Sequence, residues 1–357
     1  MVAITTLATH VTAPVNFVLM RGLLTQARKV LPYFNGTLPG NLEKNGGSLS
    51  VKWRRFDDLS PATTALTALS GNAAFGMGRT AVTPTITDIT VAIAKYGNYI
   101  NYNEELDLIN VNSRAAQLMD VLGRNVGESL NVLARDVFDG TTSVRIGSGA
   151  ANNTALTSNI TLIDIQNVVN NLNRNSAMKF FSMGTGSQNV ATSTVRASYY
   201  GICHSDVEED IRGLTGFVGV EQYGGYIGDV QVGEFGAVGG VRFSSTPIAP
   251  IATGVATTTN TTARGASDIL NDVYKTFIYG KEAVGTVGLG ENHTEQAYLM
   301  GDRIPAVILI NHPIGSSGTA DPFNELGSLA WKSWFAGAVL NPAWCYELST
   351  LASDLVE

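Results

Sequence analysis

The alternation of apolar and polar positions predicts two strands that pair as a long hairpin in the first third of the chain. Within residues 48–56, Leu49, Val51 and Trp53 alternate with polar residues, as in a strand with one covered face. Residues 85–102 alternate again, after a long stretch rich in Thr, Ala and Gly. An isolated hairpin is only marginally stable in water. We therefore expect this one to pack against a neighbour, such as another subunit.

Apolar residues spaced three or four apart predict a long helix over residues 113–139. Ser113 is a suitable N-cap, and Gly140 is a suitable stop. Gly123 and Gly127 lie inside this helix, where each glycine costs up to about 1 kcal/mol relative to alanine. We expect them to be flex points of the helix. The apolar face consists of Leu118, Leu122, Val126, Leu130, Leu133 and Val137.

A second helix is predicted at 162–173, where Thr161 and Asp164 form a capping signature. Beyond Gly184 the pattern favours β-structure. The expected elements are a strand at 194–202, a short helix at 205–213, short strands between 217 and 245, a strand pair near 273–288, a buried strand at 307–310, and strands at 327–340 and 344–348. Two longer helices and one short helix among many strands indicate an α+β fold.

Composition adds that the surface is poor in charge. Charged residues make up 15% of the 357 residues, against roughly 25% in an ordinary soluble domain. The 44% hydrophobic content excludes a disordered chain. A run of 18 apolar residues, as a membrane-spanning helix requires, is absent from the sequence. A surface short of charge usually meets another surface.

The charge is distributed unevenly along the chain. Residues 1–55 carry a net charge of +6, and the remaining 302 residues carry −13. Residues 104–140 alone carry −4. Such asymmetry is typical of contact with nucleic acid or with an acidic surface, although a solvated basic face is an equally good interpretation. The basic hairpin and the acidic helix are complementary in charge.

Residue types that carry chemistry are scattered. The four histidines are widely separated, and P-loop, nucleophile-elbow and zinc-protease motifs are absent. Cys203-His204-Ser205-Asp206 does not converge easily on one metal, and the acidic triplet 208–210 points to different faces of a short helix. We therefore expect no catalytic, metal-binding or cofactor-binding residues, and no enzyme. The sequence assigns no role to Cys203 or Cys345, which we expect to be partly buried thiols.

Several segments resemble the major capsid proteins of tailed bacteriophages, in a branch first recognised in short-tailed phages. The most specific is the run from Asp321 to Asn341, which includes Glu325-Leu-Gly-Ser-Leu-Ala-Trp331. These segments follow the expected order from about residue 20 to residue 348. The others are residues 24–31 with 51–56, 95–100, 196–206 and 232–243.

This resemblance implies the Hong Kong 97-type phage capsid fold. Its expected parts are an N-terminal arm (1–43), an extended β-hairpin loop (44–103), a peripheral domain with a spine helix at 113–139 (104–190), a mainly axial domain (191–305), and a return to the peripheral domain (306–357). The resemblance further implies self-assembly into the hexamers and pentamers of an icosahedral head that encloses double-stranded DNA. Implied partners are a scaffold protein, a portal, decoration proteins and the packaged DNA, which is contacted without sequence specificity. The implied location is the virion, assembled in the bacterial cytoplasm without a membrane.

From these charges and apolar positions we expect the hairpin to lie over a neighbouring subunit. The predicted contact residues are Trp53, Arg54, Arg55 and Phe56 of the hairpin, with Asp120, Glu128 and Asp136 of the neighbour's long helix. The alternative function is another self-assembling protein, or a secreted or outer-membrane β-rich surface protein. An outer-membrane protein is disfavoured because residues 1–20 lack the positive start of a signal peptide.

Overall fold

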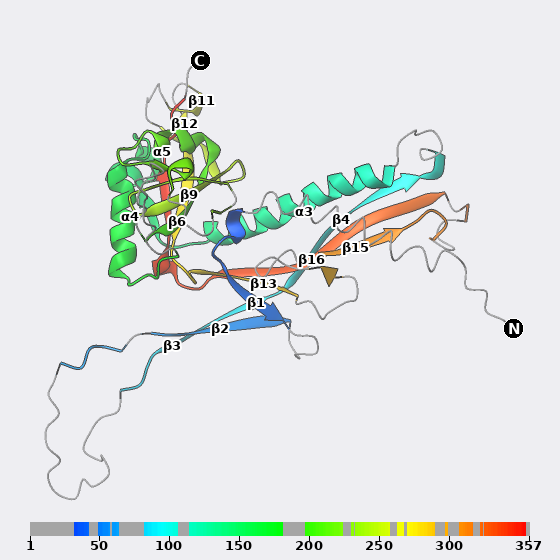
Figure 1. Cartoon of the computed structure of the whole chain (residues 1–357), viewed down its shortest axis with the longest axis horizontal. Coiled ribbons are helices and arrows are strands. Elements are labelled where there is room, and N and C mark those ends of the chain that lie inside the picture. Colours follow the sequence, from blue (N-terminus) through cyan, green and yellow to red (C-terminus); the bar gives the residue numbers. More distant parts are fainter. Residues whose placement is uncertain are drawn as a thin grey trace, which may run out of the picture.

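The computed structural model arranges the chain as two sheets, a projecting ribbon and a long helix (Figure 1). None of the helices in the described ranges is both long and apolar enough to cross a membrane. The structure describes residues 32–42, 49–57, 59–63, 82–105, 114–180, 197–223, 230–231, 233–257, 263–267, 270–289, 297–298, 307–316, 322–323 and 325–354.

The first sheet has six strands and lies beside the long helix α3 (Arg114–Asp139). The 14-residue strand β16 is its centre, because it pairs antiparallel with β4, β13 and β15. The strand order is β1 (Leu38–Leu42), β13 (Val284–Leu289), β16 (Leu326–Val339), β15 (Val307–His312) and β14 (Ala297–Tyr298), with β4 (Ala94–Asn103) also on β16.

The second sheet has nine strands and carries α4 (Leu162–Arg174) and the short α5 (Glu208–Arg212). The strand order is β5 (Val144–Ile146), β17 (Cys345–Thr350), β12 (Leu270–Tyr279), β6 (Tyr199–His204), β9 (Val241–Thr246), β8 (Glu234–Val238) and β7 (Val218–Gly219), with β10 (Ile251–Ala256) and β11 (Gly265–Ser267) on β12.

A two-stranded antiparallel ribbon projects from the first sheet (Figure 1). It consists of β2 (Ser50–Phe56) and β3 (Ile86–Ala92), with Ser50 opposite Ala92 and Phe56 opposite Ile86. The remaining short elements are 3₁₀ turns: η2 (Pro32–Phe34), η3 (Gly147–Gly149), η4 (Asn153–Ala155), η6 (Ser205–Val207), η7 (Val220–Gln222) and η10 (Pro342–Trp344).

The main core lies where α3 meets both sheets. Phe138, near the end of α3, packs among the rings of Tyr33, Phe277 and Tyr279 with centroid distances of 4.9–5.8 Å. Tyr33 belongs to η2, and its backbone N–H donates to Asn131 Oδ1 of α3. A second core, between α4 and the nine-stranded sheet, includes Ile165, Val168 and Leu172.

Both predicted helices are confirmed within one residue at the ends that the structure describes. Leu122, Val126 and Leu130 of the predicted apolar face are fully buried, as amphipathic packing requires. Thr161 caps α4 as the sequence predicts, since its hydroxyl accepts a hydrogen bond from the Asp164 N–H. Ser113, the predicted cap of α3, lies outside the described residues.

The grouping of strands differs from the sequence predictions in two places. Residues 94–103 do not continue the hairpin; they form β4 and pair with β16, whose partner side chains Trp331 and Phe335 are buried. The expected strand pair near 273–288 is two strands, β12 and β13, in different sheets. Pairing is decided by contacts distant in sequence, which alternation within one segment does not specify.

The sheet topology groups several elements differently from the expected domains, whose boundaries stay a prediction. Strand β5 and helix α4, expected with the long helix in 104–190, belong to the nine-stranded sheet and its core. Strand β17, expected to return to the same domain as β16, lies in the nine-stranded sheet between β5 and β12. Strand β17 lies in a different sheet from β16 because the chain turns at Asn341, after β16, and passes from the first sheet into the second.

Candidate interaction surfaces

The base of the ribbon is fixed to the chain's own first sheet. Trp53 lies over Gly40 and Gly285, where an added Cβ would come within 3.1 and 2.9 Å of its indole ring. The Arg55 guanidinium donates to the Leu340 carbonyl oxygen at 3.1 Å and pairs with Asp57. Trp53 and Arg55 therefore anchor the ribbon within the subunit, and their expected place at an interface between subunits stays a prediction.

The opposite face of the ribbon is exposed and carries a small ion cluster. Asp88 accepts from Arg54 Nε at 2.9 Å and from Lys52 Nζ at 2.5 Å across the strand pair. The hydrogen bonds from Arg54 and then Lys52 hold the pKa of Asp88 well below its usual range. One carboxylate and two cations leave this face with a positive charge.

The far end of the ribbon is apolar and uncovered. Phe56, 61% exposed, lies directly opposite the exposed Ile86. Leu59 and Val82, which flank the two strand ends, are exposed as well. Large apolar side chains gathered at the end of a projection are typical of a surface that meets a partner. Of the predicted hairpin residues, Phe56 and Arg54 are thus available to another molecule.

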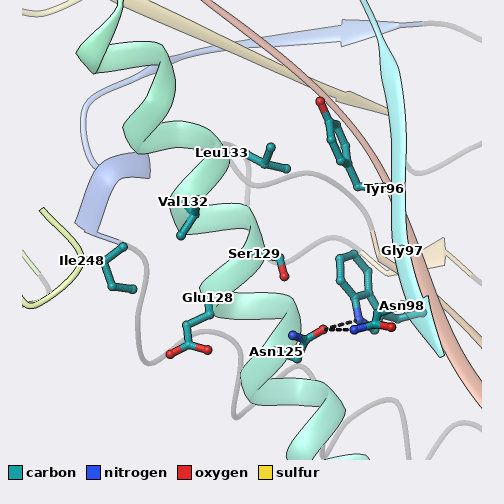
Figure 2. A pocket seen from close by; sticks show the side chains of 10 residues that line it. Tyr96, Gly97, Asn98, Asn125, Glu128, Ser129, Val132, Leu133 and Ile248 are labelled. Atoms are coloured by element: carbon teal, nitrogen blue, oxygen red, sulfur yellow. Dashed lines mark hydrogen bonds between the residues drawn. The ribbon is translucent and has the colours of Figure 1, made fainter. Parts of the chain in front are cut away.

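A groove runs between α3 and the strands β4 and β16. One part is a cavity of about 510 Å³, in which Leu133 of α3 and Tyr96 of β4 lie on opposite sides (Figure 2). A second cavity of about 650 Å³ is also lined by Leu133 and Tyr96. It extends between Val137 of α3 and the strand β16. Asn125 links the walls, since its Oδ1 accepts from Trp331 Nε1 at 3.0 Å and from Asn98 Nδ2 at 3.4 Å.

The predicted acidic residues of the long helix are all exposed. Glu128 lines the first cavity and Asp136 lines the second, so both border the apolar groove. Asp136 also pairs with Arg135 at 2.7 Å. Asp120 is exposed on α3 but is not part of either cavity wall. The groove thus has walls of mixed apolar and polar side chains, and its rim carries Glu128 and the Arg135-paired Asp136.

Gly123 and Gly127 are buried, and α3 continues as a regular helix through both positions. Buried glycines let a helix approach its neighbours closely, in keeping with the packed face that they share with Val126 and Leu130. Their predicted role as flex points stays a prediction.

The candidate chemistry noted in the sequence is used for structure. His204 caps η6 by accepting from the Asp206 N–H, and its Nε2 lies 3.1 Å from the Pro247 carbonyl oxygen. Cys203 and Cys345 are free and fully buried, deeper than the sequence analysis expected, and burial raises the pKa of Cys345 to about 12. Trp331 is a core residue. Within the described ranges, no group of three His, Cys, Asp or Glu side chains is placed to hold a metal.

Sequence reasoning missed one polar pair in the nine-stranded sheet. Arg242 and Glu234 form an ion pair whose side chains are almost fully excluded from solvent. The Tyr223 hydroxyl donates to the same carboxylate at 3.0 Å, and its ring lies against the guanidinium. The two charged residues sit eight positions apart, and only the β8–β9 pairing brings them together.

Comparison with solved structures identifies the fold. The chain superposes on the capsid protein of Ralstonia phage GP4 with a TM-score of 0.60 at 9% identity, covering 92% of this chain and 93% of that one. Cyanophage P-SCSP1u gives 0.54 at 13% identity, with coverage of 91% and 90%. Helicobacter pylori bacteriophage KHP30 gives 0.53 at 12% identity, with 89% of both chains covered.

The chain therefore has the α+β fold of phage capsid proteins, as its resemblance to that family implies. No family model and no curated protein sequence matches it. At such low identity the likeness lies in the fold. It extends over about nine-tenths of each chain.

Proposed function

We propose that this chain is a structural capsid protein, the subunit of a bacteriophage head. The observation that carries the proposal is the match over 92% of this chain and 93% of a phage capsid chain. A shell subunit needs large surfaces for its neighbours, and permanent interfaces commonly bury 2,000 Å² or more. The exposed ribbon end and the open groove supply such surfaces. A secreted β-rich surface protein is not favoured by these likenesses.

The proposal includes the finer features that the sequence resemblance implies. Copies of the chain form hexamers and pentamers that close into an icosahedral head around double-stranded DNA, with a scaffold protein, a portal and decoration proteins as partners. The subunit acts by binding its own copies and catalyses no reaction. In this assignment α3 is the spine helix and the ribbon is the extended loop.

The contact that we propose between copies joins the ribbon of one subunit to the groove of the next. Phe56 and Ile86 are the apolar end of the ribbon, and the groove offers Val132, Leu133 and Tyr96. Burying these side chains removes apolar surface from water on both copies, at roughly 25 cal/mol per Å². The contact is heterologous, so each subunit takes part in two such contacts, one through its ribbon and one through its groove.

Charge supports the same pairing. The exposed ribbon face carries Lys52 and Arg54 against the single carboxylate of Asp88. The groove of the partner is bordered by Glu128 and Asp136. Opposite charges at the rim of an apolar contact fix its orientation more than they add affinity. We therefore place Arg54 of one copy near these two acids of the next.

The test combines an apolar and a charge variant, each with a matched control. Phe56→Ala and Arg54→Glu remove the apolar end and reverse the charge without touching the anchors Trp53 and Arg55. Phe323→Ala is the control for the first, because Phe323 is 81% exposed and lies away from the ribbon. Arg174→Glu, at the end of α4, is the control for the second.

We expect both ribbon variants to remain folded by circular dichroism and to lose closed shells in negative-stain electron microscopy. Both control variants should form shells as the parent chain does. Normal shells from Phe56→Ala and Arg54→Glu would refute the ribbon contact, and absence of any assembly by the parent chain with a scaffold protein would refute the function itself.

A further inference from the structure

The end of α3 is tied directly into the nine-stranded sheet. The Thr141 hydroxyl, two residues beyond the helix, donates to the Cys345 carbonyl oxygen at 2.8 Å. The Glu347 N–H donates to the Ser143 carbonyl oxygen at 2.9 Å. These bonds attach the segment after α3 to the first half of β17. The helix packs on both sheets: Phe138, one residue before its end, contacts Phe277 and Tyr279 of β12, and Leu130 lies in the same core. This junction is where the end of α3 meets the nine-stranded sheet.

Three charged side chains from three elements meet at this junction. Lys275 of β12 places its Nζ 2.5 Å from Asp139 Oδ1, on the last residue of α3. The same Nζ lies 3.6 Å from Glu347 Oε2 of β17. The other carboxylate oxygen of Glu347 accepts from the Ser349 hydroxyl at 3.1 Å. The Glu347 side chain is 5% exposed, whereas Asp139 is 39% exposed.

The electrostatics make Lys275 the centre of the group. Burial raises the pKa of Glu347, and the nearby Lys275 charge and the Ser349 hydroxyl oppose that shift. Burial by itself lowers the pKa of Lys275, but the bonds to Asp139 and Glu347 outweigh it and the pKa is raised. The carboxylate of Glu347 is thus the buried charge that Lys275 compensates, and Asp139 is the more exposed charge that Lys275 reaches.

We propose that Asp139, Lys275 and Glu347 form an electrostatic clasp that fixes the end of α3 on the nine-stranded sheet and thereby sets the angle between the two sheets. Glu347 holds the lysine in place from within the sheet, and the lysine holds the helix. The consequence for shells rests on the proposed function. The other hydrogen bonds named at the junction lie in the segment after the helix, whereas the clasp acts on the last residue of the helix, beside the apolar contact of Phe138 with β12.

The length of α3 amplifies any change at the clasp. Its 26 residues span roughly 39 Å at about 1.5 Å per residue. A rotation of about 5° at the Asp139 end would therefore move the other end by roughly 3 Å. A displacement of that size matters in a closed shell, because the groove beside α3 must accept the ribbon of a neighbour. Subunits without the clasp should assemble at a wider range of angles.

Two variants release the clasp in different ways. Asp139→Asn removes the helix charge and leaves the buried Lys275–Glu347 pair intact. The double variant Lys275→Met with Glu347→Gln removes both charges in the sheet at similar volume. Lys275→Met alone is unsuitable, because it would leave Glu347 buried without a counter-charge. Glu208→Gln is the matched control, since it breaks the Glu208–Arg212 ion pair on α5, away from the junction.

Hydrogen exchange of the unassembled chain, read by mass spectrometry, tests the clasp without reference to shells. We expect the amides of Thr141 and Glu347 to exchange about threefold to tenfold faster in both clasp variants, and to be unchanged in Glu208→Gln. Exchange within experimental error of the parent chain in both clasp variants would overturn the proposal.

Electron microscopy of assembled particles then tests the angle. We expect the parent chain and Glu208→Gln to give shells of one size, and the clasp variants to give mixed sizes or open sheets. Faster exchange combined with uniform shells of parental size would refute the angle-setting role. If the parent chain forms no shells at all, the proposed function fails, and the exchange experiment still decides whether the clasp holds the helix.

Discussion

The nine-stranded sheet and the ribbon with its neighbouring strand β4 differ in how far they are covered by their own chain. All six residues of β6 are buried, whereas β3 alternates between exposed and half-buried residues and the first six residues of β4 are exposed. The nine-stranded sheet therefore completes its own core. The ribbon and β4 present surface that the described residues leave uncovered, which is consistent with a weakly charged chain that folds alone and binds copies of itself.

Ion pairs show the same contrast. Arg242 and Glu234 are buried together and joined by Tyr223, so neither charge has access to water. Arg54 and Asp88 pair on the exposed ribbon face. A buried pair is costly to break because one charge is left uncompensated, whereas exposed pairs contribute little to stability. The Arg242–Glu234 pair therefore contributes to the stability of the fold, whereas Arg54 remains accessible to a neighbouring subunit.

The largest expected effect separates the core from the ribbon. Phe138→Ala should cost about 3–5 kcal/mol of unfolding free energy, because it empties a fully buried site among three aromatic rings. Phe56→Ala should change stability by less than about 0.5 kcal/mol, since its ring is exposed in the subunit. Urea unfolding of the unassembled chains measures both. Equal losses of stability would erase the distinction between the two regions.

The next effect concerns the buried ion pair. Glu234→Gln should destabilise the chain by about 3 kcal/mol, the lower end of the usual range, because the amide still accepts hydrogen bonds while Arg242 loses its counter-charge. Asp88→Asn on the ribbon is the exposed counterpart and should leave the midpoint of unfolding nearly unchanged. A stable Glu234→Gln chain would show that the pair contributes little to the fold.

A smaller effect is expected at the base of the ribbon. Gly285→Ala places a methyl group about 2.9 Å from the Trp53 ring, and overpacking of this kind costs about 1–3 kcal/mol. The indole must shift, so its fluorescence maximum should move and the ribbon should change direction. Gly213→Ala is the matched control, because its methyl group would lie no closer than 3.6 Å to any neighbour. Gly149→Ala is unsuitable as a control, since Gly149 has a positive φ. Unchanged fluorescence in Gly285→Ala would show that Trp53 does not depend on this glycine.

The smallest effect is the pH dependence of Glu347. Its pKa is raised in the folded chain by burial, so the folded state binds a proton at a pH where the unfolded state does not. The stability of the parent chain relative to Glu347→Gln should therefore rise as the pH falls from neutral towards the ordinary glutamate pKa of 4.5. Thermal unfolding of both chains from pH 7 to pH 4.5 measures it. A difference that moves the other way would mean that Lys275 outweighs burial.

Local patterns predict the helices and most strands because they depend on neighbouring residues. The spacing of Leu122, Val126 and Leu130 is enough to define the buried face of α3, and Thr161 with Asp164 defines the start of α4. The capsid fold follows from the sequence resemblance rather than from these patterns, because no local periodicity specifies how two sheets share one helix.

The interaction surfaces depend on pairings that sequence does not reveal. Arg54 meets Asp88 only because β2 and β3 pair in one register, 34 positions apart. The sequence does not show that Trp53 packs within its own chain. The structure places it over Gly40 and Gly285, which are distant from it in sequence or in another strand. The clasp requires α3, β12 and β17 at one place, although its first and last residues, Asp139 and Glu347, lie more than 200 positions apart in sequence.

The most direct test of the central claim is to observe whether the expressed chain assembles. Sedimentation velocity and electron microscopy of the full chain, alone and with a candidate scaffold protein, give the answer. The account predicts capsomers or closed shells. A chain that stays monomeric under all conditions would contradict it, because the uncovered ribbon end and groove would then have no partner among copies of the chain.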